Sequence, residues 1–146
     1  MSKLFQAFLT GIFFTFILDF FLFLGIFQNY IEFHEIDVYY NILFADHQNI
    51  FIFLFFTLII GYIVIYLNKN RVSAVVLGVL FSLVGLTLLP SVGLWAGEML
   101  LMSKDITLKN THHTFVGDIY YTGRKQITFY DKDLDKIILL DKKELQ

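Results

Sequence analysis

Residues 4–27 read LFQAFLTGIFFTFILDFFLFLGIF, and this stretch decides the fold. It contains a single charged side chain, Asp19. A helix needs about 20 predominantly apolar residues to cross a hydrocarbon core of about 30 Å. The run is longer than the apolar part of a secretory signal peptide and lacks a small-residue cleavage site. It therefore predicts a membrane-spanning helix that also serves as an uncleaved anchor.

Two further apolar windows follow, at residues 49–67 and 72–97, and neither contains Asp, Glu, Lys or Arg. The chain has 146 residues, of which 57% are hydrophobic and 16% charged. So few polar residues cannot cover three such windows in a soluble fold. We predict an all-α transmembrane domain over residues 1–103 with three spans, at 4–27, 49–67 and 72–97.

The distribution of basic residues predicts the orientation. Lys3 precedes the first window, and Lys69 and Arg71 lie in the short turn between the second and third. Residues 28–48 contain no Lys or Arg, and basic residues favour the cytoplasmic side. The N-terminus is therefore expected in the cytoplasm, and the C-terminal tail in the periplasm if the membrane is a bacterial inner membrane. The loop 28–48 carries four acids, Glu32, Glu35, Asp37 and Asp46.

Residues 30–47 of this loop predict a helix that lies in the membrane interface. Apolar and aromatic side chains recur there at helical spacing, whereas the acids fall elsewhere around the helix. Tyrosines in the same segment are typical of headgroup depth. The recurring positions are Phe33, Ile36, Tyr40, Leu43, Phe44 and His47.

Residues 104–146 predict a small β tail. Three short β-like runs at 114–121, 126–130 and 136–140 are separated by turn signals at 122–124 and 131–135. We expect an antiparallel three-stranded meander. Because so small a sheet cannot bury a core alone, it should dock on the membrane surface, on the acidic loop or on another subunit.

Asp19 is the most informative polar residue, because a carboxylate inside a membrane is costly and marks a functional site by default. At equal depth on the other two windows lie Thr57 and Thr87, so the three residues predict one polar layer. In one interpretation Asp19 binds a proton or cation, or pairs with a basic residue of a partner. In the other it is protonated or hydrogen-bonded to the threonines and only holds the helices together.

The third window predicts a helix-packing face, because small residues four apart let helix backbones approach closely. This face meets either the first two spans or another protein. We also expect Pro90 to kink the helix and to tilt residues 91–102 toward the interface, with Trp95 as an aromatic anchor. The packing residues are Ala74, Gly78, Ser82, Gly85, Gly93 and Gly97.

Metal and cofactor chemistry has little support in the sequence. No two histidines are spaced four apart, no Glu-x-x-His occurs, and there is no cysteine, so we expect no metal site and no cofactor. Residues 131–142 resemble a calcium loop but lack its glycine and its final glutamate, which favours a hairpin turn. The best candidate ligands are His34, Glu35, Asp37, Asp46 and His47, with His112 and His113 on the same predicted side.

Three hypotheses for function follow. The first is a non-enzymatic accessory, assembly or stabilising subunit of a larger membrane complex, which associates with other subunits or with itself. The second is a small proton- or cation-coupled transporter or channel that uses Asp19. The third is a metal- or lipid-dependent membrane enzyme, although no catalytic constellation can be named. The net charge of -2 argues against nucleic acid as a partner.

Overall fold

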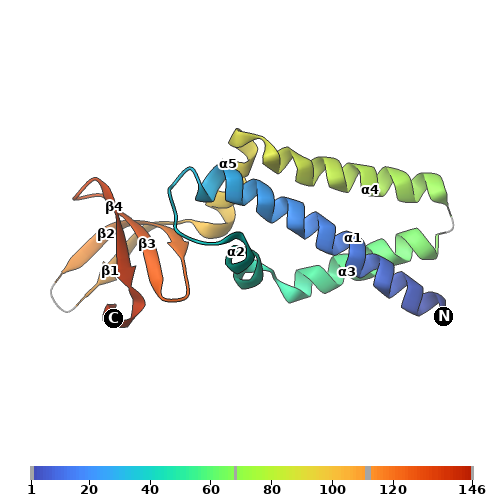
Figure 1. Ribbon diagram of the computed structural model, residues 1–146, viewed down its shortest axis with the longest axis horizontal. Helices are drawn as coiled ribbons and strands as arrows, with labels where there is room; N and C mark the ends of the chain where they lie inside the picture. Colours follow the sequence, from blue (N-terminus) through green and yellow to red (C-terminus); the bar gives the residue numbers. More distant parts are fainter. Residues whose placement is uncertain (1, 68, 111–112, 146) are drawn as a thin grey trace.

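The computed structural model describes residues 2–67, 69–110 and 113–145. Within these residues it contains five α-helices followed by a four-stranded antiparallel sheet. Three helices, α1 (Lys3–Ile26), α3 (Ile50–Ile65) and α4 (Asn70–Gly85), run along the long axis of the molecule (Figure 1). The N-terminus lies at one end of this axis and the sheet at the other.

Among the described residues, two helices are long and apolar enough to cross a membrane, judged by length and composition. The first consists of α1 and a π-helical turn, Phe27–Ile31, and has 29 residues. Ser2 caps its N-terminus, because the Ser2 hydroxyl accepts a hydrogen bond from the Phe5 amide at 3.3 Å. The second consists of α4 and a 3-10 turn, Leu86–Leu88, and has 19 residues.

The second apolar window of the sequence forms a helix that is shorter than expected. The 16 residues of α3 extend about 24 Å at 1.5 Å per residue, less than a hydrocarbon core of about 30 Å. It meets the preceding helix α2 (Tyr40–His47) at an angle of 83°. Asn49 caps α3 by accepting hydrogen bonds from the amides of Phe51 and Ile52. A third candidate span exists only if α2 and α3 count as one broken span.

The third apolar window is divided at Pro90, more sharply than the predicted kink. Leu89 has an extended backbone, with φ −77° and ψ 134°, because the ring of a following proline disfavours the helical conformation. A separate helix, α5 (Pro90–Leu101), begins with the proline in its first turn, where no amide donor is needed. The long helix therefore ends at Leu88, and α5 is not part of it.

The loop segment 30–47 is helical only at its two ends. Residues 30–31 belong to the π-helical turn and 40–47 form α2, whereas Glu35, between them, has a left-handed φ of 52°. Helix α2 lies across α1 because its aromatic side chains pack there. The ring of Phe44 contacts those of Phe16 and Phe23, with centroids 5.7 and 5.5 Å away.

The sheet has the strand order β1-β2-β3-β4, with every neighbouring pair antiparallel. The tail is thus a four-stranded meander, and the prediction missed the first strand. β1 contains a bulge between Ser103 and Ile106, with Asp105 at a φ of 55°, and its apolar–polar alternation is confined to its last four residues. The strands are β1 (Ser103–Lys109), β2 (Thr114–Thr122), β3 (Gln126–Asp131) and β4 (Lys136–Asp141).

One buried apolar cluster joins the helices to the sheet. It takes side chains from α1, the π-helical turn, the loop, α2, α5 and β2, so the sheet docks on the helical part of the chain. The docking surface includes the acidic loop, one of the three surfaces expected from the sequence. The buried members are Phe23, Ile26, Tyr30, Ile31, Ile36, Leu43, Ala96, Leu101 and Tyr121.

Candidate functional site

One group of polar side chains lies where β2 and the β2–β3 turn meet the helices. Tyr30 is fully buried, and its hydroxyl donates a hydrogen bond to the backbone carbonyl of Tyr120 at 2.8 Å. Tyr30 comes from the π-helical turn, whose extra residue per turn changes which side chains face the sheet. The aromatic ring fits because Gly97 of α5 has no side chain; a methyl group there would overlap it.

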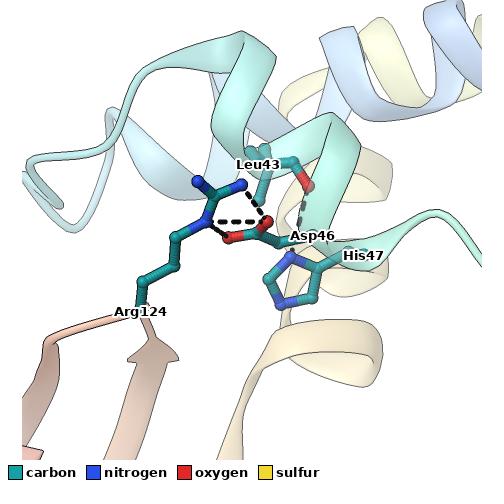
Figure 2. Close-up of polar contacts among 4 residues, drawn as sticks. All are labelled: Leu43, Asp46, His47 and Arg124. Carbon is teal, nitrogen blue, oxygen red and sulfur yellow. Dashed lines mark hydrogen bonds and ion pairs between the residues drawn. The ribbon is translucent and has the colours of Figure 1, made fainter.

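A bidentate ion pair closes the same junction from the other side. Arg124, in the β2–β3 turn, donates through Nε to both carboxylate oxygens of Asp46 at 3.0 and 2.9 Å, and through Nη2 to Oδ1 at 2.6 Å (Figure 2). Asp46 lies in the last turn of α2, next to His47, whose Nδ1 lies 3.2 Å from the Leu43 carbonyl oxygen. The hydrogen bonds from Arg124 lower the pKa of Asp46, so the pair is charged at neutral pH.

His34 occupies the centre of an aromatic group at the junction. Its ring centroid lies 4.7 Å from that of Tyr30 and 4.2 Å from that of Tyr120. Its Nε2 is buried without a hydrogen-bond partner among the described residues. Burial lowers the pKa of His34, and the nearby charge of Glu98 opposes this shift only in part, so the imidazole is neutral at pH 7.

We expect the ion pair to make sheet docking acid-sensitive. Because the pKa of Asp46 is lowered in the folded chain, its contribution is present above the ordinary carboxyl pKa of about 4 and is lost as pH falls through the lowered value. The chain has no native cysteine, so spin labels on cysteines at Asn41 and Thr122 can report the α2-to-sheet distance. The distance distribution should be narrow at pH 7 and broaden below pH 4.

Substitutions test whether the ion pair between Arg124 and Asp46 causes the acid sensitivity of sheet docking. Arg124→Gln should give the broad distribution already at pH 7, whereas Lys142→Gln, elsewhere on the sheet domain, should behave like the unsubstituted chain. If Arg124→Gln kept both the narrow distribution at pH 7 and the broadening at low pH, another group would have to be responsible.

The three residues of the predicted polar layer lie at different positions along α1. Thr57 of α3 lies against Gly11, and Thr87 lies against Gly25. These two glycines are separated by about 21 Å at 1.5 Å per residue, and Asp19 lies between them. The structure therefore does not bring Asp19, Thr57 and Thr87 together.

Asp19 has a different partner. The side-chain amide of Gln48 donates a hydrogen bond to its Oδ2 at 3.0 Å. Gln48 lies in the break between α2 and α3, next to Asn49, the cap of α3. The carboxylate thus lies at the level where α3 begins and where the chain is locally polar.

The small residues of the third window fall into two groups. Gly93 lies against Thr87 and Asn29, and Gly97 lies against Tyr30, so both permit contacts within the chain. The small residues of α4 do not permit such contacts within the described chain. Ala74, Gly78 and Ser82 are exposed, Gly85 is half-buried, and a methyl group added at Gly78 or Gly85 would meet open space.

No group of three or more His, Asp or Glu side chains suited to a metal ion occurs within residues 2–67, 69–110 and 113–145. Asp46 is engaged by Arg124, and His34 lies among aromatic rings. Within the same residues, no such group forms around the other candidate metal ligands of the loop, Glu35, Asp37 and His47. His112 lies outside the described residues, and the ring of His113 stacks on Phe115.

Two structural features were missed by the sequence reasoning. The sequence predicts only that Arg124 lies in a turn, and nothing local points to Asp46, 78 positions earlier. The close contact of α1 and α3 through Ala7, Gly11, Thr57 and Gly61 was also missed. The signal available in the sequence was the four-residue spacing of Ala7 and Gly11, and of Thr57 and Gly61.

No protein-family model, curated protein or solved structure matches this chain.

Proposed function

We propose that this chain is a non-enzymatic integral subunit of a bacterial inner membrane, where it helps to assemble or stabilise a larger membrane protein complex. The membrane placement is supported by the two long apolar helices and by α3 as a third crossing, which breaks where the chain bends by 83° into α2. It is also supported by α5, where Trp95 and Met99 remain exposed beyond the end of the long helix, as in an interfacial helix.

The proposed orientation places the N-terminus in the cytoplasm and the sheet in the periplasm. Three crossings bring the two termini to opposite sides, and the N-terminus and the sheet lie at opposite ends of the molecule (Figure 1). Lys3 and the turn that carries Lys69 and Arg71 lie at the end away from the sheet. Basic residues concentrated at one end favour that end as the cytoplasmic one.

The observation that carries the proposed role is the free face of α4. None of the 16 residues of this helix is buried, although it is among the most apolar segments of the chain. Ala74, Gly78 and Ser82, which we call the α4 ridge, are all exposed and lie along one flank of α4, beside its half-buried side. Small residues at this spacing let a second backbone approach closely. We therefore propose that a helix of another subunit packs on the α4 ridge.

The polar groups of the chain suit this role better than catalysis or transport. Asp19 is hydrogen-bonded by Gln48 and Asp46 by Arg124, so both serve contacts within the chain. A transport role for Asp19 would need that carboxylate to exchange a proton or cation. The Gln48 hydrogen bond favours a structural role for Asp19.

Gly78→Leu should abolish the complex while leaving the chain itself stable. The added side chain meets open space within the chain but would block a helix packed on the ridge. In native membranes dissolved in mild detergent, the original chain should migrate as a complex of defined mass on a native gel. The variant should lose at least about 90% of that species, which corresponds to a change of about 1.4 kcal/mol in binding.

Leu83→Phe is the matched control, because it adds bulk to an exposed position at the flank of the same helix. It should leave the complex intact. If the original chain ran as a single free chain in native membranes, the proposed function would be wrong.

A further inference from the structure

An apolar groove of about 1010 Å³ runs between the N-terminal part of α1 and the C-terminal half of α3. Its lining includes Phe5 and Phe8 from α1 and Leu58, Ile59 and Ile63 from α3. The volume is at the upper end of the roughly 300–1,000 Å³ typical of sites for organic ligands. The groove is therefore large enough for a flexible hydrocarbon chain.

The length of the groove matches one leaflet of a bilayer. On α3 its lining extends from Thr57 to Tyr66, about 14 Å at 1.5 Å per residue. This is about half of a hydrocarbon core of about 30 Å. On α1 the lining begins at Ser2, so the groove reaches the end of the molecule that lies away from the sheet.

Basic residues are close in sequence to the lining residues at this end of the groove. Lys3 lies between the lining residues Ser2 and Leu4, and Lys69 and Arg71 follow shortly after Tyr66. Residues 1–18 and 49–97 contain no Asp or Glu, and none of the ion pairs in the described chain involves these three cations. Arg71 lies in the first turn of α4, at the positive end of that helix's dipole.

Two tyrosines mark the boundary between the apolar groove and the basic end. The rings of Tyr62 and Tyr66 stack with centroids 5.6 Å apart, and both side chains are more than 40% exposed. Tyrosine prefers the headgroup level because its ring is apolar and its hydroxyl is polar. From the middle of α3 outward, the site is thus apolar, then aromatic, then cationic.

We propose that this groove binds an anionic phospholipid, with one acyl chain in the surface groove alongside the contact of α1 and α3 and the phosphate beside Lys3, Lys69 and Arg71. The unpaired positive charges select a lipid with net negative charge, because a zwitterionic headgroup would bring its own cation to a site without an acid. The inference rests on the membrane placement of the proposed function but does not depend on a partner at the α4 ridge. A bound lipid would also cover the apolar side chains of α1 and α3 that line the groove.

The test compares lipid retention by the whole chain in nanodiscs that contain equal amounts of phosphatidylglycerol and phosphatidylcholine. Native mass spectrometry after release should find phosphatidylglycerol bound in well over tenfold excess. The double variant Lys69→Gln/Arg71→Gln should lose most of this preference, since each basic residue near the lipid surface contributes about fivefold. The matched control Lys142→Gln/Lys143→Gln removes the same charge from the sheet domain and should keep it.

A second pair of variants tests the acyl chain. Ile59→Trp fills the groove and should reduce retention of both lipids, whereas Leu83→Trp, on an exposed position of α4, should not. Equal retention of the two lipids by the original chain, or an unchanged preference in Lys69→Gln/Arg71→Gln, would overturn the inference alone. Release of the chain from membranes by alkaline carbonate would overturn the proposed function as well.

Discussion

Gly11→Leu is expected to separate α1 from α3 and to unfold the helical part of the chain. A methyl group at Gly11 would already overlap the backbone carbonyl of Thr57, and one at Gly61 would overlap the carbonyl of Ala7. The two helices therefore touch backbone to backbone at two successive turns. Because a backbone carbonyl cannot rotate away as a flexible side chain can, a leucine at this position has to push the helices apart.

The expected loss is about 3 kcal/mol or more, at the upper end of the cost of overpacking a core, because the obstacle is main chain. Thermal unfolding in detergent micelles, followed by circular dichroism, measures it as a lowered Tm. Gly78→Leu is the matched control, since it makes the same substitution in an apolar helix at a position with open space. Equal melting temperatures for Gly11→Leu and Gly78→Leu would show that the close contact of α1 and α3 does not hold the helices together.

The contact between α1 and α3 shows where the sequence reasoning was incomplete. The rule of small residues four apart was applied to the third window, where Ala74, Gly78 and Ser82 proved to be exposed. Ala7 and Gly11 obey the same rule within a phenylalanine-rich run. Spacing identifies a face that allows close approach, but it does not say which helix meets that face.

The helical segments themselves could be predicted, because apolar windows free of charge have few alternatives. Their ends were less predictable. The break at Leu89 and Pro90 depends on a local backbone preference that competes with a long apolar run, and here the local preference prevailed. The bend of 83° between α2 and α3 also shortened the second span, and nothing in the apolar pattern signals such a bend.

The polar contacts could not be predicted because they join distant segments. Depth along straight helices placed Asp19 beside two threonines, whereas the bend before α3 brings Gln48 to it instead. In the same way Arg124 meets Asp46 only because the sheet folds back onto α2. The sequence predicts that so small a sheet must dock on another surface. The residues that form this surface could be identified only from the structure.

Tyr30→Ala is expected to release the sheet from the helices. Tyr30 is fully buried in the cluster that joins them, with its ring against Gly97 and its hydroxyl bonded to the Tyr120 carbonyl. Removing a buried aromatic side chain costs about 3–5 kcal/mol, because a cavity remains where the ring was. The substitution also leaves the carbonyl of Tyr120 without its donor, and the cluster has few other side chains from the sheet to compensate.

Limited proteolysis is the measurement, because an undocked sheet exposes the link between α5 and β1 while the long helices remain protected in detergent. Cleavage near Ser103 should become at least tenfold faster in Tyr30→Ala, a factor equivalent to about 1.4 kcal/mol. Tyr30→Phe removes only the hydrogen bond, worth about 1 kcal/mol, and should give an intermediate rate. Tyr39→Ala truncates a neighbouring tyrosine that is 74% exposed and should match the original chain. If Tyr30→Ala and Tyr39→Ala were cleaved at the same rate, the ion pair between Arg124 and Asp46 would have to hold the sheet in place without the buried tyrosine.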